Sequence, residues 1–493
     1  MTINALDLFL KQKRFDLIFK YIYVKSPSSF TKNAYLESIR AFNNFSEKSS
    51  NGTDKDSPEN FITIFDNLIN SIQNEGFKTE QNAIPIGRSG EIIDGAHRLA
   101  ICANFGCNIE TEPTNLDALW DYQFFRNKGM DEKVMDYGAL EYVKLNPLAY
   151  IVNLQPVTTM DNDGKVLDIL NSHGFVYYKK NCWISFNGLV NFKKICYGSF
   201  WEKAPWIGSS EDGFLGAQGH ANHSMGINPM RVFVFVCENL GEVQKAKKEI
   251  RDIYGIGNYS VHINDTHEEA ICLAENYFNA NTLFQLNTRP FHLYDEVFEN
   301  HIEVLKKECL NRKIDIYSVC GAGSTPMNVF QIRHSQDLDY LTMDEDVLPD
   351  NEIISSHNKY ERNYPHPITE IITNPSFHMY YNGVKFISLD TLYAMKKYRS
   401  EIPKDYLDCK KIRTLTFYRK ILDTIRQEQI CKKAGTKKQG KIVKYLYKYI
   451  INNKYGDVSI KAFILKKWRT LKRKCPIVAK TNTQIKKIWY CKK

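Results

Sequence analysis

The sequence lacks closely spaced cysteine pairs, although twelve cysteines occur among its 493 residues. No CxxC pair is present, and the nearest neighbours are Cys102 and Cys107. Structural zinc sites and dithiol redox centres usually rely on such pairs, so neither is expected. Scattered cysteines instead indicate reduced thiols of a cytoplasmic protein, most of them serving as small core residues.

The sequence also lacks long apolar runs and internal repeats. No run of about 18 apolar residues is available to span a membrane. The first residues, MTINALDLFLKQKRFDLIF, carry charges throughout and do not predict a signal peptide. The composition, 43% apolar and 25% charged, is typical of a folded soluble protein. A chain of this length predicts about three domains.

The net charge of +10 is unevenly distributed. Residues 431–493 hold 20 Lys and Arg and one acid, Asp457, for a net +19. The preceding 430 residues hold 46 Lys and Arg against 55 Asp and Glu, for a net −9. The protein therefore has an acidic body and a basic tail, and its overall charge is no argument for nucleic-acid binding.

Hydrophobic periodicity predicts a multidomain α/β (α+β) protein. The first segment, residues 1–156, contains an amphipathic helix at 61–75 that Gly76 is expected to end. The second segment, residues 157–292, alternates strands and helices as in an α/β layer. Its expected elements are a strand at 232–237, a helix at 241–254, a strand at 259–263 and a helix at 266–278.

The third segment, residues 293–430, has a similar alternation, and residues 431–493 form the tail. The third segment is expected to contain a helix at 297–309, strands at 314–320, 337–341 and 384–387, and a helix from Leu389. In the second segment, the glycine- and histidine-rich stretch 213–226 has no phosphate-loop spacing and is expected to be a long flexible loop.

The first chemical motif is Asp94-Gly95-Ala96-His97-Arg98, between a predicted strand and a predicted helix. Gly95 permits a tight turn, and the N–H groups of a helix N-terminus attract anions. His97 and Arg98 add donors for phosphate oxygens, and Asp94 can hold a metal ion or accept a proton. A plainer interpretation stays open, in which Asp94 caps the helix and Arg98 pairs with a surface acid.

This stretch resembles the ParB/sulfiredoxin-like superfamily, whose members include a free-serine kinase. The resemblance covers residues 35–106 and is closest to the version found on bacterial proteins of surface-polysaccharide clusters. It implies a nucleotide site in the first segment. The implied catalytic residues are Asp94, His97 and Glu47, with Glu37 as a second candidate for the general base, and the implied phosphate-binding residues are Gly95, His97 and Arg98.

DNA-partition proteins of that superfamily carry a helix-turn-helix domain after this fold. Nothing after Gly106 has that pattern, so DNA partition is disfavoured and nucleic acid is an unlikely partner.

The second motif combines a small-residue turn with two carboxylates. Asp337 and Asp339 stand at i and i+2 of a predicted strand, so both can ligate one divalent ion such as Mg²⁺. An earlier turn containing Gly323 and Ser324 allows phosphate to approach backbone N–H groups. Taken alone, such a pair of acids is more often a solvated strand end.

The order of motifs over residues 300–415 resembles the nucleotidyltransferase fold. The resemblance rests on the Gly323-Ser324 turn, Asp337-Leu338-Asp339, Ser388-Leu389-Asp390, Lys396 and Lys404-Asp405 with Asp408. It implies that Asp337 and Asp339 hold metal, and that Gly323, Ser324 and Lys396 bind nucleotide. Two departures stand out. Pro326 falls at the start of the helix after the turn, and the third acid of active members is missing from 377–383.

The stretch from His262 to Glu269 contains residue types that bind metals. It also has the form of a helix start, with Asp265 or Thr266 as the cap and Thr266-x-x-Glu269 as a capping box, and this structural interpretation is favoured. His262 and His267 remain site candidates.

Residues 441–474 of the tail pair an apolar helical stripe with many Lys and Arg. A basic amphipathic helix suits an anionic membrane surface. A helix packed on the acidic body and a nucleic-acid-binding tail are the alternatives.

The two resemblances together imply a cytoplasmic bacterial enzyme of surface-glycan assembly, which the tail would hold at the inner face of the membrane. It would transfer a phosphoryl or nucleotidyl group from ATP or another NTP, with Mg²⁺, to a sugar or polyol hydroxyl. A non-catalytic nucleotide-binding scaffold is the first alternative, which the missing third acid favours. A ParB-like DNA-binding protein is the second.

Overall fold

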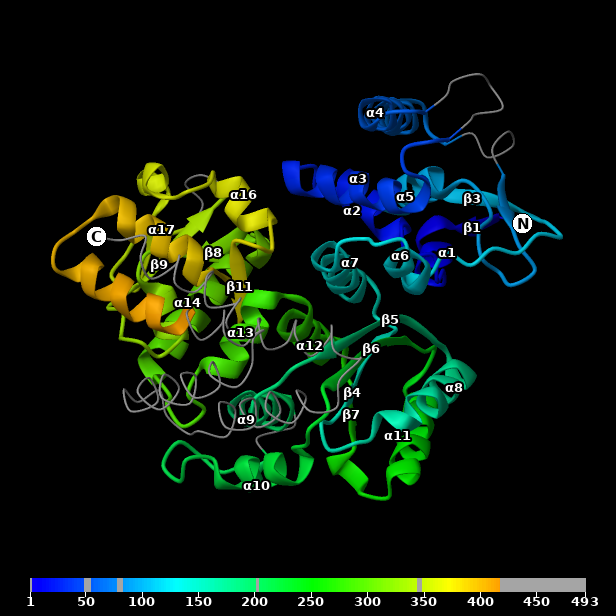
Figure 1. The fold of residues 1–493 in the computed structure, drawn as a ribbon. Helices are drawn as coiled ribbons and strands as arrows, with labels where there is room; N and C mark the ends of the chain where they lie inside the picture. Colours follow the sequence, from blue (N-terminus) through cyan, green and yellow to red (C-terminus); the bar gives the residue numbers. More distant parts are fainter. Residues whose placement is uncertain (1, 48–54, 78–82, 201–203, 344–347, 417–493) are drawn as a thin grey trace, which may run out of the picture. The chain divides into compact units, whose positions relative to one another are not determined.

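A computed structural model describes residues 2–47, 55–77, 83–200, 204–343 and 348–416. The chain divides into two units, Met1–Glu428 and Gln429–Lys493, and the predicted basic helix of the tail lies outside the described residues. The first unit mixes helices with three small sheets, which confirms the α/β class (Figure 1). Within the described ranges, no helix combines the length and apolar character needed to cross a membrane.

The first segment surrounds a three-stranded sheet of order β1-β3-β2 with helices. Helix α4 confirms the predicted amphipathic helix, and Gly76 follows it with a φ of +75°. The strands are β1 (Thr2–Asn4), β2 (Ile84–Ile86) and β3 (Asn108–Pro113). The helices are α1 (Ala5–Leu10), α2 (Leu17–Lys25), α3 (Ser29–Asn43), α4 (Pro58–Glu75), α5 (Ala96–Phe105), α6 (Tyr122–Asn127) and α7 (Glu132–Leu145).

The central sheet is antiparallel, with the strand order β5-β6-β4-β7. Its strands are β4 (Ala149–Leu154), β5 (Phe175–Cys182), β6 (Met230–Val236) and β7 (Val261–Ile263). Helices α8 (Asp163–His173) and α11 (Leu240–Tyr254) pack together against it, and α12 (His267–Phe278) packs on β4 and α7. The alternation predicted for this segment is therefore correct.

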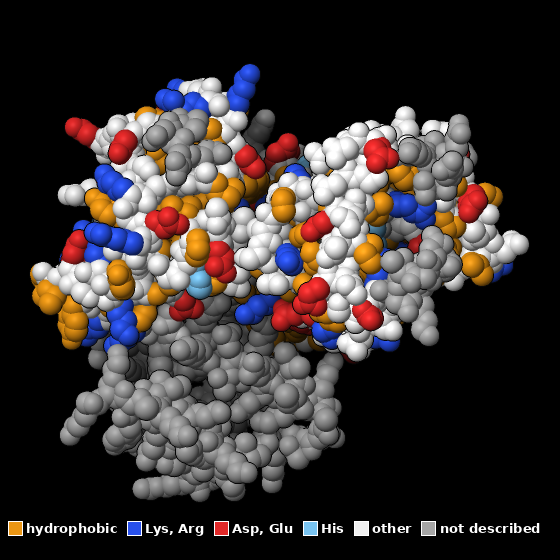
Figure 2. All heavy atoms as spheres, turned by 90° about the horizontal axis from the view of Figure 1, so that it is seen from above, with side chains coloured by type: hydrophobic (Ala, Val, Ile, Leu, Met, Phe, Trp, Pro, Cys, Tyr) orange, Lys and Arg blue, Asp and Glu red, His pale blue; other side chains and the backbone are white. Residues whose placement is uncertain are grey.

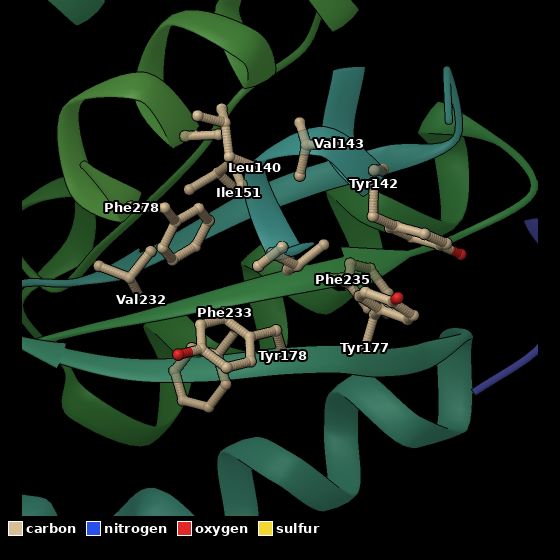
Figure 3. Packing of buried hydrophobic residues seen from close by; sticks show 14 of the residues in the cluster. Leu140, Tyr142, Val143, Ile151, Tyr177, Tyr178, Val232, Phe233, Phe235 and Phe278 are labelled. Carbon is tan, nitrogen blue, oxygen red and sulfur yellow. The ribbon is translucent and has the colours of Figure 1, made fainter. Parts of the chain in front are cut away.

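The boundary expected after Pro156 does not coincide with a structural division. Strand β4 precedes it, yet β4 lies between β6 and β7 in the central sheet. The core crosses the same boundary, because Tyr142 of α7 stacks on Tyr177 of β5 with 3.5 Å between ring centroids (Figure 3). One buried cluster contains residues of both segments, so they share a single core.

The insertion between β5 and β6 corrects a second prediction. Residues 213–226 were expected to form a loop, but Leu215–Ser224 forms helix α10. Ala217, His220, Ala221 and Ser224 are buried on one face of α10, at the spacing that a helix provides. Packing of this face stabilises a helix that its glycines disfavour. The insertion also contains helix α9 (Phe186–Lys194), a π-helical turn at Ile195–Ser199 and a 3-10 turn at Pro205–Ile207.

The third segment has its own sheet, of order β10-β9-β8-β12-β11, and its own core. The predicted strand at 314–320 begins only at Val319, because Asp315 caps a 3-10 turn at Ile316–Ser318. The strands are β8 (Val319–Gly321), β9 (Leu338–Thr342), β10 (Ile354–Ser356), β11 (His378–Tyr381) and β12 (Val384–Ile387). The helices are α14 (Glu296–Arg312), α15 (Thr325–Val329), α16 (Ile368–Thr373) and α17 (Leu389–Arg399), and residues 404–416 are helical. Helix α13 (Ala280–Thr288), at the end of the second segment, packs on β11.

Acidic and basic side chains intermingle over the described residues on the face drawn in Figure 2. This mixed surface agrees with the small net charge of the body and is typical of ordinary globular proteins.

Candidate functional site

The Gly323-Ser324 turn and Asp339 meet at the end of β8. The turn leaves β8, and the Ala322 N–H donates to the Asp339 carbonyl at 2.7 Å. Gly323 has a φ of +55°, and a Cβ at that position would lie 1.8 Å from Asp339 Oδ2. Only glycine therefore allows the carboxylate to lie against the turn. Pro326 lies in the first turn of α15, where proline is tolerated, so it does not interrupt that helix.

The Asp339 carboxylate has the environment of a cation ligand. Burial raises its pKa, and the nearby charge of Asp337 raises it further. The Ser355 hydroxyl donates to Asp339 Oδ1 at 3.2 Å. Asp337 immediately precedes β9, so the two predicted ligands are neighbours. Repulsion between two carboxylates is relieved by a divalent cation, which makes the pair suitable for Mg²⁺.

Ser324 is held by two cations. Its Oγ accepts hydrogen bonds from Arg333 Nη2 at 2.9 Å and from Lys396 Nζ at 3.2 Å. Lys396 is fully buried and pairs with Asp405 at 3.1 Å and Asp408 at 2.9 Å. Lys396 thus joins Ser324 of the predicted turn to Asp405 and Asp408, the two acids of the stretch that begins at Lys404.

The carboxylates beside Lys396 are strongly ionised. Burial alone would raise the pKa of Asp405, but the hydrogen bond from Arg399 and the charge of Lys396 outweigh it and lower the pKa to about 2. Asp408 accepts from Arg333 Nε and Nη2, both at 2.9 Å. The network contains three cations and two carboxylates, and it holds Ser324 in position within the turn.

A tyrosine–histidine pair that no sequence motif predicts also contacts the turn. The Gly323 N–H donates to Tyr364 Oη at 3.2 Å, and Tyr364 Oη hydrogen-bonds His357 Nδ1 at 2.5 Å. Burial lowers the pKa of His357 to about 4, helped by Arg399 and Lys359. His357 precedes and Tyr364 follows the 3-10 segment Asn358–Asn363. Such an irregular segment has no sequence periodicity from which this contact could be predicted.

The stretch 377–383, from which the third acid is missing, does not lie next to β9 in the sheet. Residues 378–381 form β11, at the far end of the sheet from β9. Strand β9 lies between β8 and the edge strand β10, and Ser355 of β10 is in register with Asp339 of β9. The residue of β10 beside the Asp339 carboxylate therefore carries a hydroxyl, that of Ser355.

The residues of the first motif, Asp94 to Arg98, face two different environments. Gly95, with a φ of +80°, caps α5, so Asp94 is not the cap. The Asp94 side chain is 81% exposed, and Arg98 Nη2 lies 3.6 Å from Asp94 Oδ2. This geometry fits the plainer interpretation of an arginine paired with a surface acid, although the pair remains accessible to a ligand.

His97 faces a different environment from Asp94. Its Nε2 hydrogen-bonds Tyr35 Oη at 2.9 Å, and its ring lies 4.7 Å from Phe65. Burial holds the pKa of His97 well below its usual value, and Lys20 and Lys55 lower it further. A neutral imidazole is therefore available at neutral pH, on the inner side of α5.

The two candidate general bases differ in placement. Glu47 accepts from Lys55 Nζ at 2.8 Å, and its charge helps burial to raise the pKa of Tyr35. Glu47 therefore belongs to the surroundings of His97. Glu37 instead accepts from Arg40 Nη2 and from the Asp131 N–H, both at 2.8 Å, and holds the turn before α7.

The histidines of the central segment do not form one site. Thr266 caps α12, and its Oγ1 accepts from the Glu269 N–H at 3.3 Å, as predicted. His267 Nε2 hydrogen-bonds the Val143 carbonyl at 2.7 Å. His262 Nε2 hydrogen-bonds Glu269 Oε1 at 2.7 Å, and both side chains are buried.

Cys196 joins the His262–Glu269 pair. Its thiol and one ligand atom of each partner lie within 4.8 Å of one another, and all three residues are buried. Cys196 lies in the π-helical turn, 66 residues before His262, so sequence spacing gives no sign of the contact.

Comparison of the chain with protein-family models, curated proteins and solved structures finds no significant match. The function is therefore argued from the site itself.

Proposed function

We propose that this protein carries out Mg²⁺-dependent phosphoryl or nucleotidyl transfer from ATP or another NTP to a sugar or polyol hydroxyl. The observation that carries the proposal is the close approach of the Asp339 carboxylate to Gly323, beside a Ser324 hydroxyl held by Arg333 and Lys396. This arrangement offers a cation ligand, a turn suited to phosphate and compensating positive charge within one small region.

The residues fit a bound Mg²⁺ and nucleotide. Asp337 and Asp339 would hold the ion, whose chemistry is to neutralise phosphate charge and polarise a phosphoryl oxygen. Gly323 lets the Asp339 carboxylate lie against the turn, and the Ser324 hydroxyl beside it would orient a phosphate oxygen. Arg333 and Lys396 hold that hydroxyl in place, so they act on substrate through Ser324.

The first segment supports a nucleotide-binding role of the ParB/sulfiredoxin-like type. The exposed Asp94–Arg98 pair at the glycine-capped start of α5 is accessible to phosphate, and Glu47 lies in the surroundings of the neutral His97. In this proposal Asp94, Gly95 and Arg98 contact phosphate, while His97 and Glu47 serve proton transfer. The basic stretch 441–474 would bring the protein to an anionic membrane surface at the site of glycan assembly.

Nucleotide binding tests the proposal directly. The melting temperature of the full chain is measured with ATP and CTP, with and without Mg²⁺. A ligand at 100 times its Kd stabilises by about 2.7 kcal/mol, which a thermal shift detects. The Mg²⁺-dependent part of the shift should disappear in Asp339→Asn and persist in Asp390→Asn, a matched carboxylate exposed in the first turn of α17. An equal Mg²⁺-dependent shift in the two variants, or none in the unmodified chain, would reject a site at Asp339.

A second candidate function is a non-catalytic nucleotide-binding scaffold. The observation that favours it is Ser355, a hydroxyl where a carboxylate on β10 would complete a two-metal site. The scaffold predicts nucleotide binding without product when sugars and polyols are supplied, and binding that Asp337→Ala leaves intact. Turnover that Asp337→Ala abolishes favours the enzyme.

A further inference from the structure

The buried triad Cys196, His262 and Glu269 lies in the central segment, apart from the phosphate-type motifs. Each residue comes from a different element: the π-helical turn, β7 and α12. None is more than 2% exposed. Single turns of π-helix inside helices are rare and frequently occur at functional sites. The triad is thus assembled by tertiary structure rather than by a local motif.

The three side chains supply compatible ligand atoms. A sulfur, an imidazole nitrogen and a carboxylate oxygen lie within 4.8 Å of one another. On a tetrahedral ion, nitrogen and oxygen ligands at bond lengths of about 2.0–2.1 Å stand about 3.3 Å apart. The His262–Glu269 hydrogen bond of 2.7 Å would have to open by roughly 0.6 Å, within the reach of small side-chain rotations.

We propose that Cys196, His262 and Glu269 form a binding site for a zinc-type divalent cation. Sulfur and imidazole ligands select Zn²⁺ over Mg²⁺, which prefers oxygen ligands alone. Three protein ligands leave a fourth position for water or substrate, the ligand count of catalytic zinc sites. The absence of a CxxC pair does not argue against such a site, since its single cysteine is brought to the histidine by the fold.

Proton balance accompanies binding. The Cys196 thiol releases its proton to become a thiolate ligand, while the single ring proton of a neutral His262 moves from Nε2 to Nδ1, so that Nε2 can bind the ion. Glu269 then supplies negative charge from the helix start, where Thr266 holds its backbone. Zinc uptake should therefore release protons in a weakly buffered solution.

The Lys193 and Lys247 amines are close enough to Cys196 and His262 to interact with them electrostatically, and they give the proposal a sharp test. Lys193 of α9 is buried, and its Nζ has no hydrogen-bond partner within the described part of the chain. Lys247 of α11 donates to the Ile263 carbonyl at 2.8 Å. A cation site is opposed by a neighbouring ammonium, whereas an anion site would depend on it. Lys193→Met should therefore tighten metal binding, or leave it unchanged, and an anion site predicts the opposite.

The experiment loads metal-free protein with Co²⁺ and then displaces it with Zn²⁺. With excess Mg²⁺ present to fill the carboxylate site proposed at Asp337 and Asp339, the expected result is one cobalt ion per chain and a sulfur-to-cobalt charge-transfer absorption that disappears in Cys196→Ser. Zinc affinity should fall in Cys196→Ser and Glu269→Gln by more than the roughly 10- to 100-fold that loss of an outer-shell partner costs.

Matched controls separate ligand loss from general damage. Cys237→Ser alters a buried cysteine whose thiol contacts the His173 carbonyl, and His267→Gln alters a histidine bound to Val143. Both should keep the absorption and the affinity, and circular dichroism of every variant establishes that it folds. No stoichiometric cobalt, equal absorption with and without Cys196, or stabilisation by inorganic phosphate that Lys193→Met removes would each overturn the metal site.

Discussion

Replacing Gly323 by alanine should disrupt the phosphate-type site, and Gly383→Ala provides a matched control. Both glycines have left-handed backbones, with φ values of +55° and +73°. An added Cβ would lie 1.8 Å from Asp339 Oδ2 in the first case, but would meet nothing within 4 Å in the second. The left-handed conformation costs a residue with a Cβ about 1–2 kcal/mol, and both variants bear that cost.

Only Gly323→Ala adds steric overlap. Overpacking a tightly packed position typically costs about 1–3 kcal/mol, so this variant should be less stable than Gly383→Ala by that amount. Since the carboxylate must move to relieve the overlap, Mg²⁺-dependent nucleotide binding should fall in Gly323→Ala alone.

Urea unfolding of both variants measures the stability difference, and a nucleotide thermal shift measures binding. Equal stability of the two alanine variants would refute the close approach of Asp339 to the turn. A Gly323→Ala protein that binds nucleotide as well as Gly383→Ala would refute its role in the site.

Three further perturbations test the surroundings. Because burial lowers the folded-state pKa of His357 to about 4, the unfolded chain binds the extra proton as the pH falls from about 6.5 to 4. The resulting contribution to the free energy of unfolding is present above pH 6.5 and is lost toward pH 4, by at most about 1.4 kcal/mol per pH unit. Urea unfolding at a series of pH values should show this loss in the unmodified chain and not in His357→Asn. Asp405→Asn removes one of the two carboxylates that pair with the buried Lys396. It should lower the free energy of unfolding in urea by about 2–3 kcal/mol, less than the roughly 3–5 kcal/mol lost when the sole partner of a buried charge is removed. An unchanged unfolding midpoint would contradict the pairing. Tyr35→Phe removes the hydrogen bond to His97 and should cost about 1–2 kcal/mol, whereas a neutral effect would show that His97 finds another partner.

Local patterns could be predicted where one element determines the arrangement. The helix α4 follows from its apolar spacing and from Gly76 at its end. The turn around Gly323 and the carboxylates near β9 follow from small residues after an apolar strand and from alternation along the next one. Such features depend on residues close together in the sequence, so the spacing of apolar and small residues is enough to predict them.

Long-range partners could not be predicted. Cys196 meets His262 because the insertion between β5 and β6 folds back on the sheet, and no spacing rule describes that return. Ser355 lies beside Asp339 through strand register, and Tyr364 reaches Gly323 from an irregular segment. Helix α10 forms because its buried face packs, which outweighs the weak helix propensity of its glycines.

The place of β4 restricts how this chain can be divided. A fragment ending at residue 156 would carry β4 with both edges unpaired, which invites aggregation. The complementary fragment would leave β7 without its neighbour, because β4 separates β7 from β6. Any exchange or truncation that keeps both halves folded must therefore cut before Ala149, so that the strand travels with the segment that follows it. Such a cut would also separate Tyr142 from Tyr177, whose stacked rings join the first segment to the sheet. Each half would then expose a face that the intact chain buries.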